Sequence, residues 1–353
     1  MQEPYLSIII PAYNAEKTIG RLVDSIFLSK RAPAFEMVVV DDVSTDKTSQ
    51  TLKSPKLLRS LRIVRHRTNR GPAAARNTGA QKARGAVLLF LDSDVVVFPD
   101  TLYQVAKAFN NDPDLFALTG VWDKEQQTSA FFPRFKALRD WSYWTNERDQ
   151  RGYYYLFSTR VAAIRRDLFL RLGGFDESYK KASVEDIEFT YRVARRYAVV
   201  FEPKVRVKHE FETFWAVARK YFIRSHDWSA LYATRGKFDP VAATRSEAVT
   251  AVSAVGFLGS LVLLIFMRGI RGVIGVKGEL IELLFLLLLF CFLLLHLYGV
   301  RKFLWFVYRE EGLLFAIKSF FMGLILYIII VLGSAAFTRE KFSSKFNSCI
   351  LNF

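Results

Sequence analysis

Two aspartates, Asp92 and Asp94, are the residues of this chain whose type and spacing are best suited to chemistry. They follow Val87–Leu91, an apolar run that predicts a short buried strand. Alternate residues of an extended chain point to the same side, so the two carboxylates leave the strand together. Carboxylate oxygens bind Mg²⁺ or Mn²⁺, whose coordination is completed by water and substrate phosphates. Aspartates also cap turns, so the surrounding sequence decides between the two roles.

Polar side chains also follow other predicted strands. Tyr5–Ile10 and Phe35–Val40 are β-branched, apolar runs, and Asn14 and Asp42 come shortly after them. Segments with helical spacing separate the strands, and this alternation predicts an α/β fold with a mostly parallel sheet covered by helices on both faces. In such sheets ligands bind at the carboxyl ends of the strands. We therefore expect one crevice to collect Asn14, Asp42 and Asp92.

The ordered motifs of the chain resemble glycosyltransferase family 2, the inverting nucleotide-sugar transferases with the GT-A fold. The resemblance covers roughly residues 5–228 and rests on these segments: Ser7–Asn14, Val38–Asp46, Asn69–Gly71, Ala75–Gly79, Asp92–Asp94, Gly173–Glu177 and Val184–Glu188. It implies a donor site made by the following residues: Pro11, Tyr13, Asn14, Asp42, Arg76 and Asp92. The family's tyrosine stacks on the nucleotide base and its aspartate binds the base imide, which implies a preference for uridine. Val43 stands where the family usually has glycine.

The resemblance also assigns a metal site. Asp92 and Asp94 take the position that holds Mg²⁺ or Mn²⁺, with Asp94 preferred as the direct ligand. His209 stands where many relatives place a histidine that completes the site, although a single histidine is also often structural. The bound ion would neutralise charge on a departing diphosphate.

The acceptor side is assigned by two later motifs, which contain Gly174, Phe175, Asp176 and Glu185. Asp186 takes the position of the general base, a role that contributes about 10²–10⁴-fold to the rate. Without the resemblance, an acidic pair at the start of a helix would be explained by the helix dipole.

Trp228 lies in Arg224–Trp228, which partly resembles a motif of processive polysaccharide synthases. Asp227 stands where that motif has arginine, which argues against chain extension. Trp228 is then either an acceptor-stacking residue or an anchor at the membrane interface.

Apolar composition concentrates in the last third of the 353-residue chain. Three runs approach the roughly 20 residues needed to cross a bilayer. We expect the following parts: a catalytic domain (1–210), aromatic and basic interfacial helices (211–247), a membrane domain (248–338) with two to three transmembrane helices (about 249–267, 280–300 and 313–337), and a basic tail (339–353). The aromatic segment 131–155 fits either a core helix or a helix on the membrane surface.

Charge and cysteine content narrow the classes of protein to which this chain could belong. The formal charge of +16 indicates binding to anionic lipid headgroups rather than to nucleic acid, because no nucleic-acid motif accompanies it. Only Cys291 and Cys349 occur, so a disulfide framework or a cysteine-based metal site is not expected. The first residues lack the pattern of a secretory signal, which predicts a catalytic domain on the cytoplasmic face of the cytoplasmic membrane.

The sequence thus predicts a membrane-anchored, metal-dependent, inverting glycosyltransferase of cell-envelope glycan synthesis. Its donor is a nucleotide-diphospho-sugar, and its acceptor is a hydroxyl of a polyprenyl-linked saccharide or a glycolipid. One alternative is a polyprenyl-phosphate sugar synthase, whose anionic phosphate acceptor needs no base. A second is a membrane scaffold that keeps the fold without catalysis. The sequence gives no preference for a particular sugar, linkage or oligomeric state.

Overall fold

The computed structural model describes residues 3–53, 61–148, 155–236, 245–274 and 279–350. The chain divides into two compact units, Met1–Thr213 and Phe214–Phe353. The finer domain boundaries expected from the sequence remain predictions.

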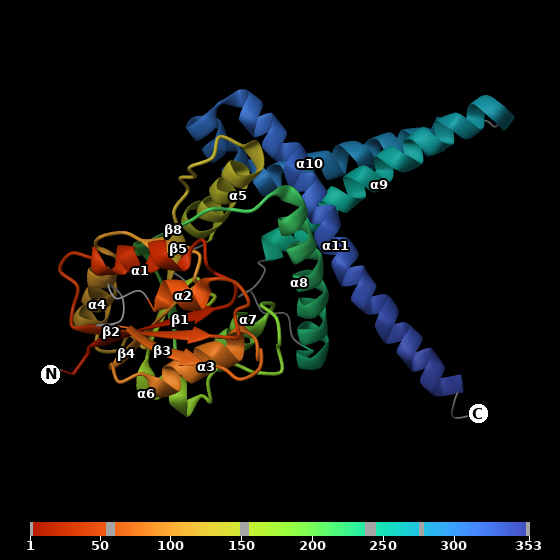
Figure 1. The fold of residues 1–353 in the computed structure, drawn as a ribbon. Coiled ribbons are helices and arrows are strands. Elements are labelled where there is room, and N and C mark those ends of the chain that lie inside the picture. The colour runs from red at the N-terminus through yellow and green to blue at the C-terminus, as the bar shows by residue number, and fades with distance from the viewer. Residues whose placement is uncertain (1–2, 54–60, 149–154, 237–244, 275–278, 351–353) are drawn as a thin grey trace. The chain divides into compact units, whose positions relative to one another are not determined.

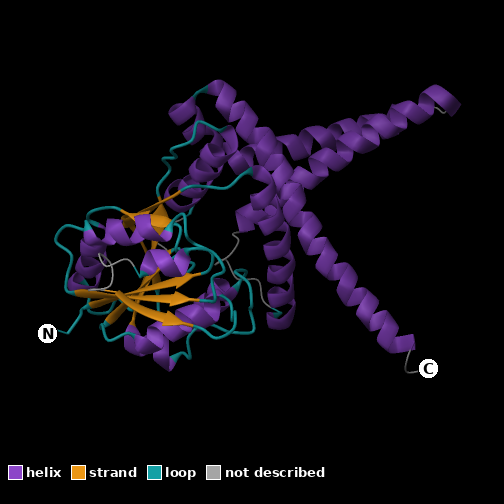
Figure 2. Ribbon diagram, in the orientation of Figure 1, coloured by secondary structure: helices purple, strands orange, loops and turns teal. Residues whose placement is uncertain are grey.

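The first unit is built on one eight-stranded sheet with the order β3-β2-β1-β4-β7-β6-β8-β5 (Figures 1 and 2). Its strands are β1 Leu6–Ala12, β2 Phe35–Asp41, β3 Leu61–Arg65, β4 Val87–Leu91, β5 Val95–Val97, β6 Ala117–Trp122, β7 Val161–Arg165 and β8 Val199–His209. The first four are parallel, β7 is antiparallel to β4 and β6, and β5 is antiparallel to β8. The predicted α/β class with a mostly parallel sheet is confirmed.

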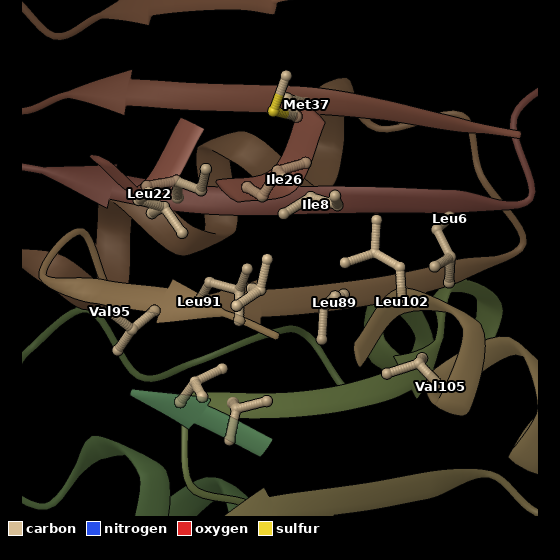
Figure 3. Packing of buried hydrophobic residues seen from close by; sticks show 14 of the residues in the cluster. Leu6, Ile8, Leu22, Ile26, Met37, Leu89, Leu91, Val95, Leu102 and Val105 are labelled. Carbon is tan, nitrogen blue, oxygen red and sulfur yellow. The ribbon is translucent and has the colours of Figure 1, made fainter. Parts of the chain in front are cut away.

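Alternating side chains of the central strands fill two cores, one on each face of the sheet. In β1, Leu6, Ile8 and Ile10 face one core, while Ile9 faces the other. The first core is completed by α1 Ile19–Phe27, α2 Thr48–Leu52 and α4 Thr101–Asn111, and Figure 3 shows part of its packing. The second is completed by α3 Pro72–Lys82, α6 Arg166–Arg171 and α7 Glu185–Val193. Such double burial explains why these strands read as continuous apolar runs.

Packing decides the structure of two local segments. The apolar pattern over residues 156–164 is typical of a strand, but β7 begins only at Val161: Phe157 is buried outside the ladder and donates its N–H to the Thr190 hydroxyl at 2.9 Å. The aromatic segment forms α5 Phe131–Ser142 and the π-helix η1 Tyr143–Glu147. Trp144 and Tyr155 are buried in the second core, which favours the core interpretation over the membrane-surface one. Residues 149–154 of the segment lie outside the described residues.

The second unit consists of four long helices, α8 Phe214–Arg235, α9 Arg245–Ile274, α10 Glu279–Glu311 and α11 Leu313–Ile350. Among the described residues, three segments are long and apolar enough to cross a membrane: Ser246–Gly269, Glu279–Glu311 and Leu313–Arg339. They contain the three runs expected from the sequence. Many of their large apolar side chains are exposed, which suits a lipid environment.

Candidate active site

A buried arginine connects the two halves of the candidate site. Arg76 in α3 donates from Nη2 to Asp92 Oδ1 at 2.7 Å and from Nη1 to Glu185 Oε1 at 3.0 Å. Arg76 and Glu185 are each only 4% exposed, whereas Asp92 is 32% exposed. Burial alone would lower the pKa of Arg76, but the carboxylates of Asp92, Glu185 and Asp186 outweigh it and raise the pKa. Arg76 therefore stays charged and holds Asp92, just after β4, and Glu185, at the start of α7, together.

Asp186 sits in the first turn of α7, directly after Glu185. Glu185 accepts the Ser183 N–H at 2.8 Å through its second oxygen, which fixes the start of the helix. The backbone oxygen of Asp186 accepts the Thr190 hydroxyl at 2.6 Å, and its Oδ1 accepts the Ile187 N–H. The helix thus holds the Asp186 carboxylate close enough to Arg76 to raise the pKa of its guanidinium.

Asp94 and His209, 115 residues apart in sequence, meet because β5 pairs with β8, with Val95 opposite His209. His209 Nε2 lies 3.3 Å from Asp94 Oδ2. Trp122 stacks on the imidazole with the ring centroids 4.8 Å apart. Gln126 holds the backbone that follows the imidazole, because its side chain donates to the His209 carbonyl and accepts the N–H of Phe211. The imidazole is therefore oriented by its neighbours.

These two side chains suit a divalent cation. They offer one imidazole nitrogen and carboxylate oxygens from a half-exposed aspartate, a donor set that Mn²⁺ accepts. Among the described residues, no group of three or more His, Cys, Asp and Glu side chains gathers into a complete metal cage. An ion held here needs ligands from substrate phosphates and water, as Mg²⁺ and Mn²⁺ sites on phosphate substrates commonly do.

Asp42 is buried and accepts hydrogen bonds from the loop before α3. Its Oδ1 accepts the Arg70 N–H at 2.9 Å and its Oδ2 accepts the Gly71 N–H at 2.7 Å. His66 Nδ1 lies 2.6 Å from the same carboxylate, while His66 Nε2 lies 2.9 Å from the Thr78 hydroxyl. The structure thus gives Asp42 a clear role in shaping the loop that follows β3, next to its expected role in base binding.

Three of the expected donor-site residues lie at or just after the end of β1. Pro11 lies within β1, and Tyr13 is 53% exposed, as a base-stacking side chain must be. Asn14 has a positive φ of 51°, and its Oδ1 accepts the Thr45 N–H at 2.9 Å. Val43 also has a positive φ, 66°, which is strained for a β-branched residue.

The Gly173–Glu177 segment is latched to α3 by Asn77, which the sequence analysis did not single out. Asn77 accepts the Phe175 N–H and donates to the Phe175 carbonyl, each at 2.8 Å, and donates to Glu177 at 3.1 Å. A Cβ on Gly174 would lie 2.4 Å from Asn77 Oδ1, so only glycine fits this contact. Phe175, expected on the acceptor side, is 2% exposed and packs in an aromatic core cluster. Asp176 accepts the Ser178 N–H and shapes the following turn.

Trp228 belongs to α8 in the second unit and stacks on Tyr232 with ring centroids 5.8 Å apart. The structure therefore gives it a partner on its own helix. Its role toward an acceptor or a membrane remains a prediction.

Sequence reasoning also did not single out His66, Trp122 and Gln126. Their importance follows from contacts across the fold, because each of them contacts a predicted site residue that is distant in sequence. Only their position at or just after the ends of β3 and β6 hinted at the site, because residues at the carboxyl ends of strands gather at one edge of the sheet.

Residues 7–173 match the family model described as Glycosyl transferase family 2. Among curated proteins, the validoxylamine A glucosyltransferase of Streptomyces hygroscopicus subsp. limoneus is 29% identical over 217 residues, covering 54% of this chain and 48% of that protein. The poly(ribitol-phosphate) β-N-acetylglucosaminyltransferase TarS of Staphylococcus aureus is 39% identical over 104 residues, covering 28% of this chain and 18% of that protein. The matches therefore span about half or less of these relatives' own lengths.

A likeness over nearly the whole chain comes from a solved structure. The mannosyltransferase PcManGT from Pyrobaculum calidifontis, in complex with GDP-Man and Mn²⁺, aligns with a TM-score of 0.57. The alignment covers 97% of this chain and 89% of that chain, at 17% sequence identity. At this identity the likeness shows a shared fold.

Proposed function

We propose that this chain, which belongs to glycosyltransferase family 2, transfers a sugar from a nucleotide-diphosphate donor to a hydroxyl of a membrane-held acceptor. The acceptor would be a polyprenyl-linked saccharide or a glycolipid of the cell envelope. The observation that carries the proposal is the Arg76 bridge, which joins Asp92 on the donor side to Glu185 on the acceptor side. The similarity of TarS, a transferase that acts on a poly(ribitol-phosphate), supports a cell-envelope role.

The donor site in this proposal contains Pro11, Tyr13, Asn14 and Asp42, and Arg76 orients Asp92. The Tyr13 and Asp42 pair favours a uridine nucleotide, although the likeness to PcManGT, solved with GDP-Man, keeps other nucleotides open to test. Asp94 and His209 would hold Mg²⁺ or Mn²⁺, which would neutralise charge on the diphosphate leaving group. The Mn²⁺ bound to PcManGT supports this requirement.

The transfer is a single displacement with inversion at the anomeric carbon. The acceptor oxygen forms a bond to that carbon while the bond to the donor diphosphate breaks, and the nucleoside diphosphate leaves. Asp186 takes the hydroxyl proton during the attack, which makes a weakly nucleophilic hydroxyl reactive. Its place at the start of α7 beside Arg76 supports this role.

The membrane parts of the proposal rest on the second unit. Three helices with the length and composition of membrane spans would keep the enzyme at the bilayer that confines its acceptor. Because nucleotide sugars are cytoplasmic metabolites, we place the first unit on the cytoplasmic face of the cytoplasmic membrane. Membrane lipids are then partners of the second unit.

The test measures sugar transfer from a panel of labelled nucleotide sugars into membrane lipid extracts, with Mn²⁺ present. Asp186→Asn is compared with wild type and with Asp167→Asn, a matched control on a carboxylate that is 69% exposed. We expect a labelled lipid product that falls by about 10²–10⁴-fold in Asp186→Asn and is unchanged in the control.

Two other outcomes point to the alternatives. A product that persists near the wild-type rate in Asp186→Asn indicates a phosphate acceptor, and hence a polyprenyl-phosphate sugar synthase. Metal-dependent nucleotide binding without turnover of any donor indicates a non-catalytic scaffold.

A further inference from the structure

A groove of about 550 Å³ lies between α10 and α11 in the second unit. Its α10 wall consists of residues at helical spacing on one face of the helix: Leu297, Arg301, Leu304, Trp305 and Tyr308. Its α11 wall consists of Leu313, Ala316, Ile317 and Phe320. The groove is apolar, and Trp305 and Leu313 are more than half exposed along it. Its chemistry therefore suits a hydrocarbon chain.

Among the described residues that line the groove, Arg301 carries the only charge. Its guanidinium lies 3.7 Å from the centroid of the Tyr298 ring and donates to the Tyr298 carbonyl oxygen. Neither contact neutralises the charge, and a guanidinium has five N–H donors in a fork that matches phosphate oxygens. The groove thus combines an apolar wall with one phosphate-binding group.

Arg301 also has the depth that a lipid phosphate would have. The 33 residues of α10 measure about 50 Å at about 1.5 Å per residue, longer than the roughly 30 Å hydrocarbon core. The apolar run expected to cross ends at residue 300, so Arg301 falls where the hydrocarbon gives way to headgroups. Trp305 and Tyr308 follow it, and such aromatic side chains are enriched at that level.

The groove opens near the turn between α10 and α11, where Gly312 has a positive φ of 86°. If α9, α10 and α11 each cross the membrane, two crossings return the chain at Gly312 to the side from which α9 starts. That side is the one on which the first unit is placed by the proposed function.

We propose that this groove binds the tail of a polyprenyl phosphate or diphosphate, with Arg301 on the phosphate nearest the lipid. The inference rests on the proposed function, since it names the lipid carrier of the same acceptor. A carrier with one chain and one phosphate-bearing end matches the groove, which lies between two helices and has Arg301 as the charged residue of its described lining.

The test measures binding of radiolabelled undecaprenyl phosphate to the full chain in phosphatidylcholine nanodiscs. Arg301→Gln should weaken binding about tenfold or more, because the phosphate loses a direct hydrogen bond from a charged side chain. Lys302→Gln, which removes the same charge from the neighbouring residue outside the groove, should leave binding unchanged. Because Arg301 is exposed, its substitution leaves the helix packing intact.

A second pair of variants tests the apolar wall. Ala316→Trp fills the groove and should lower binding by more than about tenfold. Leu314→Trp adds the same side chain at a position of α11 that is 66% exposed and outside the groove, and should bind like wild type. Equal binding by Ala316→Trp and Leu314→Trp would overturn the proposal, as would full competition by phosphatidylglycerol.

The same nanodiscs separate this inference from the proposed function. Sugar transfer to a lipid-linked acceptor without measurable binding of undecaprenyl phosphate would refute the groove and leave the proposed function standing. Saturable, Arg301-dependent binding without any sugar transfer would retain the groove and refute the proposed function.

Discussion

The Arg76 bridge leads to the most direct prediction about the stability of the first unit. Arg76→Met keeps much of the side-chain volume but removes the charge that Asp92 and Glu185 share. Removing one partner of a buried ion pair costs about 3–5 kcal/mol, because the other charge stays buried without compensation. Glu185 is 4% exposed and falls in this class. Asp92 is 32% exposed and can be rehydrated, so it adds little to the cost.

We therefore expect Arg76→Met to lower the free energy of unfolding of the first unit by about 3–5 kcal/mol. Domains are typically stable by only about 5–15 kcal/mol, so the loss would be a large fraction of the total. The assay is a urea titration of the full chain in detergent, with pulse proteolysis reporting the folded fraction of the first unit. The midpoint and slope give the free energy.

Two further variants turn this measurement into a test of the mechanism. Arg76→Met combined with Glu185→Met removes both buried charges, and it should recover most of the lost stability because apolar residues replace buried ion pairs at little cost. Arg171→Met is the surface control, since its pair with Asp167 is 57% and 69% exposed, and it should change stability by less than about 1 kcal/mol.

The reasoning fails if Arg76→Met is no more destabilising than Arg171→Met. It also fails if the double variant loses as much stability as Arg76→Met and Glu185→Met, each measured alone, lose in sum, because that would show that the two charges do not interact.

Three other variants test local features of the first unit. Val43→Gly should stabilise the first unit by up to about 1 kcal/mol, because relief of about 1–2 kcal/mol of left-handed backbone strain exceeds the entropic cost of ordering a glycine. A lower urea midpoint for this variant would contradict the strain. His209→Ala should weaken Mn²⁺ binding at least about tenfold in calorimetry with nucleoside diphosphate present, and unchanged affinity would remove it from the cation site. Burial opposes ionisation of Glu36, but hydrogen bonds from Ser7 and Arg84 outweigh this effect and lower the pKa of the carboxyl group. The ionised carboxylate therefore stabilises the fold at neutral pH, and this stabilisation is lost as the pH falls below about 4. Glu36→Gln should therefore reduce stability at pH 7 and have no effect at pH 2; an equal loss at both would show that ionisation is irrelevant.

The central fold was predictable because local patterns agree with it. Strand and helix periods along the first 100 residues define the parallel part of the sheet, and the rule about strand ends places Asn14, Asp42 and Asp92 at one edge. The long apolar helices were equally clear, since composition alone defines them.

Packing decided what the sequence left open. The ion pair of Arg76 with Glu185 joins residues 109 positions apart, and no spacing rule links α3 to α7. An apolar pattern also does not separate a strand from a buried loop, as Phe157 shows. Burial produced the pattern there, and the surrounding fold determined the backbone conformation.

The edge position of β5 has a consequence for how the proposed cation would enter and leave. β5 is three residues long, lies at the end of the sheet and pairs only with β8 among the described strands. Short edge strands open locally at a small fraction of the global unfolding free energy. Separating Asp94, just before β5, from His209 breaks this one ladder and exposes Val95 and Val97, which are buried in the first core, but it requires no other strand to leave the sheet. Ion loading would then appear as slower amide hydrogen exchange at Val95–Val97, with little change in the central strands.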